Sequence, residues 1–268
     1  MKKIFLMLLA ACALCAACSE ISEDDRYTLR PPAERKRTVL LEEFTGQTCT
    51  NCPTAHRIVN GLKQQYGDGF ISVSIHAGMF GIADNPNMPW QGLMTPEGDE
   101  YASHWGVSFY PSGMVNRTSG VLNMDDWADR VYEDVAKAPI LDIRLSAGVE
   151  TGEDGVRTIV VHTDLEPSQN IDGYLQLWIT ESGIRSVQID GGTTLTDYEH
   201  NHVYRASVNG LWGEKLSLSA HLYTTYEHRI AVGEKWDAGN LSVVGFVYND
   251  AEGVLQAAEC EVQTDTED

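Results

Sequence analysis

Residues 39–56 read VLLEEFTGQTCTNCPTAH, an apolar run that leads into two cysteines and then into a helical pattern. Val39–Phe44 predicts a buried strand, and the apolar residues of Thr54–Tyr66 recur at helical spacing. Cys49 and Cys52 therefore stand at a strand-to-helix junction, where cysteines three residues apart can close a small disulfide. The free N–H groups and the positive dipole end of the first helical turn favour the thiolate of Cys49.

The rest of the first half alternates strands and helices. Phe70–His76 reads as a second strand, and the polar, punctuated segment Ala77–Thr95 reads as irregular. The pattern then predicts a helix over Pro96–Trp105, a short strand over Ser112–Arg117 and a helix over Met124–Ala138. Alternation of this kind predicts an α/β layer.

The pattern changes at Ala138–Pro139, beyond which no convincing helix interrupts a series of strands. Period-two alternation predicts strands over residues 140–149, 156–165, 173–180, 202–208, 215–223 and 241–247. Strands at such short spacing indicate an all-β antiparallel sandwich. We therefore expect an α/β domain over residues 38–138 and a β-sandwich domain over residues 139–268.

The first half resembles a thioredoxin-like domain at three separated points, of which the cysteine pair is one. The second is Glu43, six residues before Cys49, where thioredoxins keep a buried carboxylate that can relay a proton. The third is Tyr110-Pro111 before a strand, where thioredoxin-like proteins have a cis-proline that helps to hold an extended peptide. The resemblance implies that Cys49 is an exposed attacking thiolate and that Cys52 resolves the mixed disulfide. Glu43 would then assist deprotonation, and Pro111 and Tyr110 would shape the peptide site.

Each of these points also has a structural interpretation. The disulfide could simply brace the domain, Glu43 could be a solvated acid beside Glu42, and Pro111 could end a loop in the trans form. The pair also lacks the Trp-Cys-Gly-Pro-Cys surround of the most familiar reductants, because Thr50 and Asn51 separate its cysteines.

Metal binding is another chemistry that this sequence allows. Cys49, Cys52 and His56 form a Cys-x-x-Cys-x-x-x-His run, and His76 ends the second strand, so copper or zinc could bind there. No second cysteine pair completes a closed site, and we expect neither a metal nor another cofactor. His200 and His202 lie in a polar turn and are expected to face solvent.

The N-terminus reads as a lipoprotein signal over residues 1–17. Lys2 and Lys3 precede a short apolar stretch, which is shorter than the roughly twenty residues of a spanning helix. Small residues precede Cys18, our expected lipid-attachment site, and Cys12 is the alternative. An acidic tether follows within residues 18–37. Lipid would then provide the stable membrane anchor.

The formal net charge of −20 disfavours nucleic acid as a partner. Export beyond the inner membrane would place the remaining cysteines in an oxidising compartment, so the Cys49–Cys52 pair could be redox-active or permanently oxidised. Cys260 has no obvious partner and lies in an apolar-alternating tail, which favours a half-buried packing cysteine.

Several segments in combination resemble the Omp28-related outer-membrane lipoproteins of Gram-negative bacteria. The segments that carry the resemblance are 41–46, 49–56, 110–117, 243–249 and 254–257. The resemblance implies an anchored lipoprotein with a thioredoxin-like domain and a β-rich C-terminal domain, on the periplasmic face or at the cell surface. It implies little about substrate.

Two hypotheses about function follow. In the first, the protein is a lipid-anchored thiol–disulfide oxidoreductase whose partners are proteins that carry thiols or disulfides. In the second, it is a non-enzymatic surface protein whose sandwich binds an envelope or surface ligand, while the disulfide only braces the first domain. Burial of the cysteine pair would favour the second hypothesis, because a redox partner needs access.

Overall fold

The structure is a computed structural model that describes residues 37–264. The predicted signal segment, Cys12, Cys18 and nearly all of the tether lie outside the described residues. Among residues 37–264, no helix is both long enough and apolar enough to cross a membrane.

A parallel β–α–β unit opens the described chain. Strand β1 (Val39–Thr45) leads through helix α2 (Cys52–Tyr66) and a 3₁₀ turn, η2 (Gly67–Gly69), into β2 (Phe70–His76). Both strands are buried along their whole length, and they pair in parallel from Val39 opposite Phe70 to Thr45 opposite His76. The predicted helix and the predicted second strand are confirmed. A strand that is apolar on both faces suits this position, because helices cover both sides of the sheet.

The segment that was predicted to be irregular contains only a short 3₁₀ turn, η3 (Gly78–Phe80), and an isolated bridge between Ala83 and Met94. The predicted elements then follow, with Thr95 and Asn123 capping helical N-termini by accepting backbone N–H groups. They are α3 (Pro96–His104), β3 (Ser112–Val115) and, in place of one helix from residue 124, the 3₁₀ turn η4 (Met124–Asp126) followed by α4 (Trp127–Val135). The short strand β4 (Leu122–Asn123) was not predicted.

Strands make up most of the second half. They are β5 (Leu141–Thr151), β6 (Arg157–Pro167), β7 (Ile171–Glu181), β8 (Ile184–Asp190), β9 (Thr193–His200), β10 (Val203–Ser207), β11 (Glu214–Leu218), β12 (Thr224–Ala231), β13 (Leu241–Asn249) and β14 (Gly253–Gln263), with a 3₁₀ turn, η5 (Ala238–Asn240), before β13. The six predicted strands are present. The periodicity did not resolve β8, β9, β12 and β14 as separate strands.

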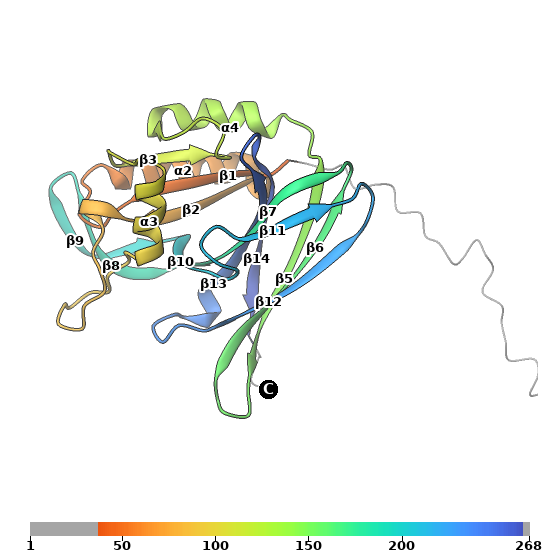
Figure 1. The fold of residues 1–268 in the computed structure, drawn as a ribbon. Coiled ribbons are helices and arrows are strands. Elements are labelled where there is room, and N and C mark those ends of the chain that lie inside the picture. The colour runs from red at the N-terminus through yellow and green to blue at the C-terminus, as the bar shows by residue number, and fades with distance from the viewer. Residues whose placement is uncertain (1–36, 265–268) are drawn as a thin grey trace, which may run out of the picture. The chain divides into compact units, whose positions relative to one another are not determined.

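One large mixed sheet of twelve strands runs through both halves, in the order β12-β6-β5-β14-β13-β7-β10-β2-β1-β3-β4, with β11 beside β7. Strand β10 joins the halves by pairing in parallel with β2 at Val203 and Ser74. The predicted change of pattern at residues 138 and 139 falls between α4 and β5. Sheet and core continue across it, and residues 37–264 belong to one compact unit. The protein is thus mostly β, with one mixed sheet and a few helices (Figure 1).

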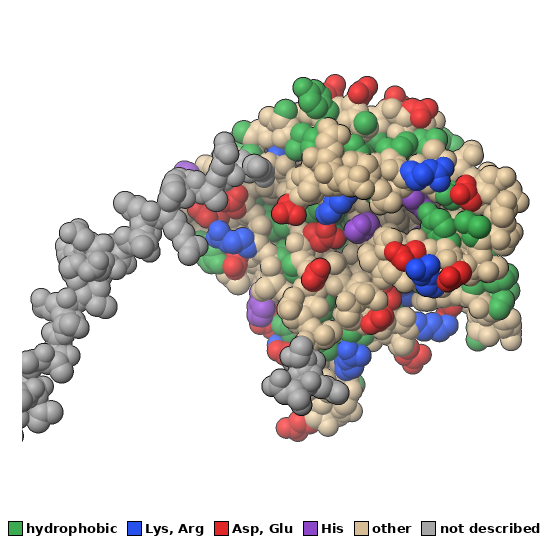
Figure 2. Space-filling model, turned by 180° about the vertical axis from the view of Figure 1, so that it is seen from behind, with side chains coloured by type: hydrophobic (Ala, Val, Ile, Leu, Met, Phe, Trp, Pro, Cys, Tyr) green, Lys and Arg blue, Asp and Glu red, His purple; other side chains and the backbone are tan. Residues whose placement is uncertain are grey.

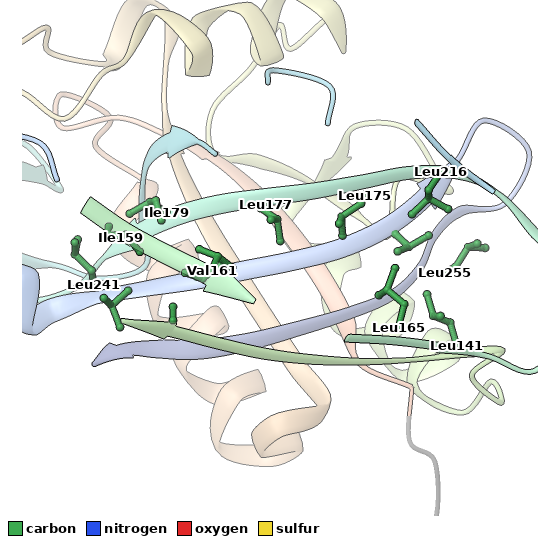
Figure 3. Packing of buried hydrophobic residues seen from close by; sticks show 14 of the residues in the cluster. Leu141, Ile159, Val161, Leu165, Leu175, Leu177, Ile179, Leu216, Leu241 and Leu255 are labelled. Atoms are coloured by element: carbon green, nitrogen blue, oxygen red, sulfur yellow. The ribbon is translucent and has the colours of Figure 1, made fainter. Parts of the chain in front are cut away.

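The second half packs its strands over an aliphatic core. Side chains of β5 and β6, including Leu141, Ile159 and Leu165, face side chains of β7, β13 and β14 across this core (Figure 3). An entirely antiparallel arrangement was expected, but β14 pairs in parallel with β5 at Val262 and Ala147.

The first half has a different core on each face of its strands. Helices α2 and α4 cover one face, where Leu41, Val59 and Trp127 are buried together. Helix α3 covers the other face, where Leu40 and Phe44 of β1 share a core with Trp178 and Phe246 of the second half. Successive residues of β1 therefore point to opposite faces, which sends Glu42 and Glu43 to different environments.

A buried ion pair occupies the face shared with the second half. Arg117 donates from Nε and Nη2 to the two carboxylate oxygens of Glu42, at 2.6 and 3.0 Å. Its guanidinium also lies 4.5 Å from the ring centre of Tyr248 and 4.9 Å from that of Phe246. Ion pairing and cation–π contacts of this kind hold a charge that would otherwise be costly to bury.

Candidate functional site: a covered disulfide beside a buried carboxylate

Cys49 and Cys52 form a disulfide at the junction of β1 and α2. The loop turns tightly there, with the N–H of Cys49 donating to the carbonyl of Gly46 at 3.1 Å. Both cysteines are buried: Cys49 is 2% exposed and Cys52 is 0% exposed. The prediction that Cys49 is exposed at the helix start is therefore wrong, because residues far away in the sequence cover it.

The cover is the β8–β9 hairpin, a two-stranded sheet separate from the large one. Figure 1 shows it on the side of the molecule away from β5, β6 and β12. The side chain of Gln188 donates to the carbonyl of Cys49 at 3.0 Å. Backbone N–H groups of Ile189 and Gly191 donate to the carbonyls of Gln47 and Thr50, at 2.9 and 3.2 Å. The hairpin thus binds directly to the cysteine loop.

Gln47 ties the cysteine loop to the hairpin and to the segment before α3. Its side-chain amide donates to Ser186 Oγ at 2.9 Å and to the carbonyl of Gln91 at 3.0 Å. Its side-chain oxygen accepts the N–H of Leu93 at 2.9 Å. The apolar cluster at the base of the hairpin is small and consists of Leu93, Ile184 and Val203. Hydrogen bonds therefore contribute much of the attachment of the hairpin.

Segment 78–80 covers another side of the cysteine loop. Phe80 accepts, at its carbonyl, both the N–H and the hydroxyl of Thr48, each at 3.0 Å. A Cβ atom at Gly46 would lie 2.4 Å from that same carbonyl group, so only glycine allows this approach.

Glu43 lies on the face of β1 that α2 covers, and its side chain is fully buried. Ser74 Oγ of β2 donates to its Oε2 at 3.0 Å. Its Oε1 lies 3.5 Å from Nε2 of His56, which is one helical turn beyond Cys52. Burial raises the pKa of Glu43 to about 8, although the Ser74 hydrogen bond opposes this. The predicted buried carboxylate is therefore present, and near neutral pH it can both hold and release a proton.

His56 connects this carboxylate with the hairpin. Its Nε2 also lies 3.2 Å from Thr45 Oγ1, and its Nδ1 lies 2.8 Å from the hydroxyl of Tyr198 in β9. Burial lowers the pKa of His56 to about 4, and the neighbouring positive charge of Arg57 acts in the same direction. The imidazole is therefore neutral at physiological pH.

Two further histidines lie beside this network. His76 is 2% exposed, and its ring lies 5.2 Å, centre to centre, from that of His200. His200 is also 2% exposed, so the prediction that it faces solvent is wrong; the turn that was expected there is the buried end of β9. Burial lowers the pKa of both histidines, that of His200 to about 3.

A polar cavity of about 40 Å³ lies among these side chains and is lined by Glu43, His56, Ser74, His76, Tyr198 and His200, among others. Within residues 37–264, no group of three or more His, Cys, Asp or Glu side chains is arranged to hold a metal ion. The cysteines that were considered as metal ligands are joined to each other.

The Tyr110–Pro111 peptide bond is cis, as predicted. Strand β3 begins directly after it and pairs with β1 so that Ser112 lies opposite Phe44. Pro111 is thus at the end of the sheet where β1 passes into the cysteine loop. The ring of Tyr110 packs edge-on against that of Phe80, the residue whose backbone covers the loop.

Cys260 has no part in this site. It is a free, half-buried cysteine in β14, opposite Val243, and it packs against the aliphatic core of the second half. Burial raises the pKa of its thiol to about 11. The predicted packing role fits this placement.

The hairpin and Tyr198 are the parts of the site that the sequence analysis missed. Gly191-Gly192 between two short strands is a hairpin signal, and both glycines have positive φ angles, 55° and 90°. That signal predicts a hairpin, but nothing in it indicates that the hairpin lies over a loop about 140 residues earlier in the chain.

Comparison with known proteins identifies a family and similar folds. The family model for outer membrane protein Omp28 matches residues 98–266, which is more than half of the chain and does not include the cysteine pair. No curated protein matches the sequence.

The solved structures that match this chain include the following three. HBP35 of Porphyromonas gingivalis has a TM-score of 0.64 at 15% identity, over 87% of this chain and 79% of its own. A protein from Agrobacterium tumefaciens has a TM-score of 0.50 at 14% identity, over 88% of this chain and 98% of its own. A domain of the outer membrane lipoprotein Omp28 from Porphyromonas gingivalis has 21% identity over 48% of this chain and 93% of its own, with a TM-score of 0.34. The first two likenesses show the fold alone.

Proposed function

This chain belongs to the Omp28 family of outer membrane proteins, and we propose that it is a lipid-anchored member whose Cys49–Cys52 pair exchanges thiols and disulfides with other proteins. The observation that carries the proposal is Glu43. A carboxyl group buried beneath the helix that holds Cys52, with a pKa of about 8, is costly for stability and suited to proton transfer near neutral pH.

The arrangement of the first half supports the proposal. The parallel β1–α2–β2 unit, the antiparallel β3 and β4, and cis-Pro111 beside the cysteine loop are the parts that a thioredoxin-like domain over residues 38–138 requires. The proposal assigns Pro111 and Tyr110 to the binding of an extended substrate segment.

The proposed chemistry proceeds through a mixed disulfide. A thiolate of the partner attacks Sγ of Cys49, the Cys49–Cys52 bond breaks, and Cys52 leaves as a thiolate. Glu43 then gives its proton to the Cys52 thiolate. A second partner thiolate attacks the partner sulfur of the mixed disulfide and displaces Cys49 as a thiolate, so the partner leaves oxidised and the protein reduced. In the opposite direction the Cys49 thiolate attacks a partner disulfide and displaces one partner thiolate. Glu43, as carboxylate, then takes the proton of Cys52, and the Cys52 thiolate attacks Sγ of Cys49 and displaces the second partner thiolate, so the protein is oxidised and the partner reduced.

Access requires the β8–β9 hairpin to move, because both cysteines are buried beneath it. Elements that are attached mainly by hydrogen bonds open at lower free-energy cost than elements with large apolar contacts. Gln188→Ala removes the side chain that donates to Cys49 and should speed reduction of the disulfide by a small dithiol. Thr194→Ala, at an exposed position of β9, is the matched control and should leave the rate unchanged.

The lipid anchor rests on the sequence before residue 37. We place the acyl chains on Cys18, because a basic start and a short apolar segment precede small residues at positions 16 and 17. Labelling with radioactive palmitate should mark the wild type and the Cys12→Ala variant but not the Cys18→Ala variant. Label that persists in Cys18→Ala would reject this site.

The acidic surface limits which kinds of molecule this protein is expected to bind. Figure 2 shows acidic side chains spread over the visible face among basic side chains and histidines, and the chain carries a formal net charge of −20. Proteins that carry thiols or disulfides are the partners that the disulfide chemistry requires, and the acidic surface disfavours nucleic acid.

Turnover by the soluble protein tests the proposed function. Wild type should catalyse disulfide exchange on a model peptide, and Cys49→Ser should abolish it. Cys260→Ser is the matched control, because it removes the free thiol and keeps the pair, and it should retain wild-type turnover. Equal turnover in wild type and Cys49→Ser would reject the mechanism.

The burial of both cysteines favours a second candidate function. In that alternative the disulfide is a structural brace, and the strands of the second half bind an envelope or surface ligand. A brace would resist thiol labelling after treatment with millimolar dithiol under native conditions, and Gln188→Ala would not change that resistance.

A further inference from the structure

Glu43 needs a connection to solvent if it is to recover the proton that it gives to Cys52 when the protein is reduced. Each exchange cycle moves one proton between Cys52 and Glu43, and the carboxyl group is fully buried. Its two polar neighbours are Ser74, which donates to Oε2, and His56, whose Nε2 lies 3.5 Å from Oε1. Ser74 lies on the buried strand β2 and lines the same polar cavity as His56.

His56 connects Glu43 with a more exposed side chain. Its other nitrogen, Nδ1, lies 2.8 Å from the hydroxyl of Tyr198, a partly exposed residue of the hairpin. Glu43, His56 and Tyr198 also line the same polar cavity of about 40 Å³. A cavity of this size and polarity can hold an ordered water beside the three side chains.

We propose that His56 and Tyr198 form the proton route between Glu43 and solvent, so that the hairpin which covers the disulfide also supplies the outer group of the route. This inference rests on the proposed exchange function. It assigns proton-relay roles to a helix residue one turn beyond Cys52 and to a residue from the second half of the chain.

The proton balance of the route is simple. After Glu43 has protonated the Cys52 thiolate, its carboxylate recovers a proton from Nε2 of His56, in the tautomer that carries the proton there. At the same time Nδ1 of His56 takes the hydroxyl proton of Tyr198, and the phenol oxygen of Tyr198 takes a proton from water. One proton enters from solvent, and His56 has changed tautomer without keeping a charge. A neutral imidazole is the form that burial favours at this position.

Other titratable side chains face the same cavity. The buried His76 of β2 and His200 of β9 line it, and so do the exposed Glu199 and the partly exposed His202. Arg57 of α2 acts on His56, and Arg205 of β10 acts on His76. Burial keeps His76 and His200 neutral near pH 7, so neither competes with His56 as a charged group.

The test compares the rate of the proton uptake that follows reduction of the disulfide by a small dithiol, read with a pH-indicator dye, in four proteins over pH 6–9: wild type, His56→Gln, Tyr198→Phe and Tyr132→Phe. Tyr132 is 68% exposed on α4 and provides the matched control. The route predicts that His56→Gln slows this proton uptake near pH 7 about 10²-fold, as expected for the loss of a proton-transfer group. Tyr198→Phe should slow it several-fold, and the loss in both should shrink with rising buffer concentration, because a small buffer acid can replace the route.

Chemical rescue separates a relay from a structural role. His56→Ala in added imidazole should regain much of the wild-type rate, while its equilibrium reduction potential stays that of the wild type. Wild-type rates and pH profiles in both His56→Gln and Tyr198→Phe would overturn the route. A loss of rate that is equal at every pH and not rescued by imidazole would also overturn it. If wild type and Cys49→Ser are equally inactive towards a partner disulfide, the proposed function fails instead.

Discussion

Replacing Glu43 with Gln should make the protein more stable at neutral pH, and the structure gives the size of the gain. Burial raises the pKa of Glu43 from 4.5 to about 8. The difference between these two values corresponds to about 5 kcal/mol. At pH 7 the folded protein still holds this proton and the unfolded chain has lost it, so folding carries a penalty of roughly 3 kcal/mol.

The pH window of this penalty follows from the two values. Below about pH 4.5 the carboxyl is protonated in both states, so the penalty is absent. As the pH rises from 4.5 to 8, the unfolded state binds fewer protons than the folded state, and the free energy of unfolding falls. Above about pH 8 the penalty is complete. Gln carries no titrating proton, so Glu43→Gln removes this dependence.

Urea unfolding followed by tryptophan fluorescence, with the disulfide intact, measures the effect at pH 5, 7 and 8. The free energy of unfolding of Glu43→Gln minus that of wild type should be small at pH 5 and reach roughly 3 kcal/mol at pH 7. Glu153→Gln, at an exposed turn between β5 and β6, should show no such trend. A difference that does not change with pH, or a Glu43→Gln variant that is less stable than wild type at pH 8, would refute the reasoning.

Three further predictions concern the neighbourhood of the site and the shared core. Arg117→Met should lower the free energy of unfolding by about 3–5 kcal/mol, because it leaves the Glu42 carboxylate buried without its partner. A second substitution, Glu42→Gln, should recover part of this loss. A loss below about 1 kcal/mol in urea unfolding would contradict the prediction. Gly46→Ala should lower the free energy of unfolding by about 1–3 kcal/mol, because it forces a Cβ against the Phe80 carbonyl. Gly61→Ala, in open space on α2, should raise it by about 0.5–1 kcal/mol. Equal thermal midpoints for the two variants would contradict the packing argument. Because burial lowers the pKa of His76, the unfolded chain binds a proton below about pH 6.5 that the folded protein does not bind, so acidification destabilises the fold. His76→Phe should reduce the loss of unfolding free energy between pH 6.5 and 4.5. An unchanged slope would count against burial as the cause.

The first half could be predicted well because its signals are local. Strand β2 was predicted with the bounds that it has, and helix α2 begins two residues earlier than the predicted start. The resemblance to thioredoxin-like domains predicted a buried carboxylate at Glu43, six residues before Cys49, and a cis bond before Pro111, and both are present. Each of these rests on periodicity or on the order of motifs along the chain.

The cover of the disulfide could not be predicted, because it depends on pairing between distant segments. The hydrogen bond from Gln188 to Cys49 joins residues 139 positions apart, and the pairing of Val203 with Ser74 is also long-range. Sequence patterning finds the strands of such an arrangement but not their neighbours. The expectation of an exposed Cys49 and of a solvent-facing His200 failed for this reason: the second half folds over the first.

The reduction potential of the Cys49–Cys52 pair tests the central claim most directly. Equilibration of the soluble protein with dithiol–disulfide buffers, followed by thiol labelling, measures it, and Cys260→Ser removes the background of the free thiol. Our account predicts a potential above roughly −250 mV, within the range of exchange catalysts. A potential below roughly −300 mV, together with slow reduction, would mark the pair as a structural disulfide and contradict the account.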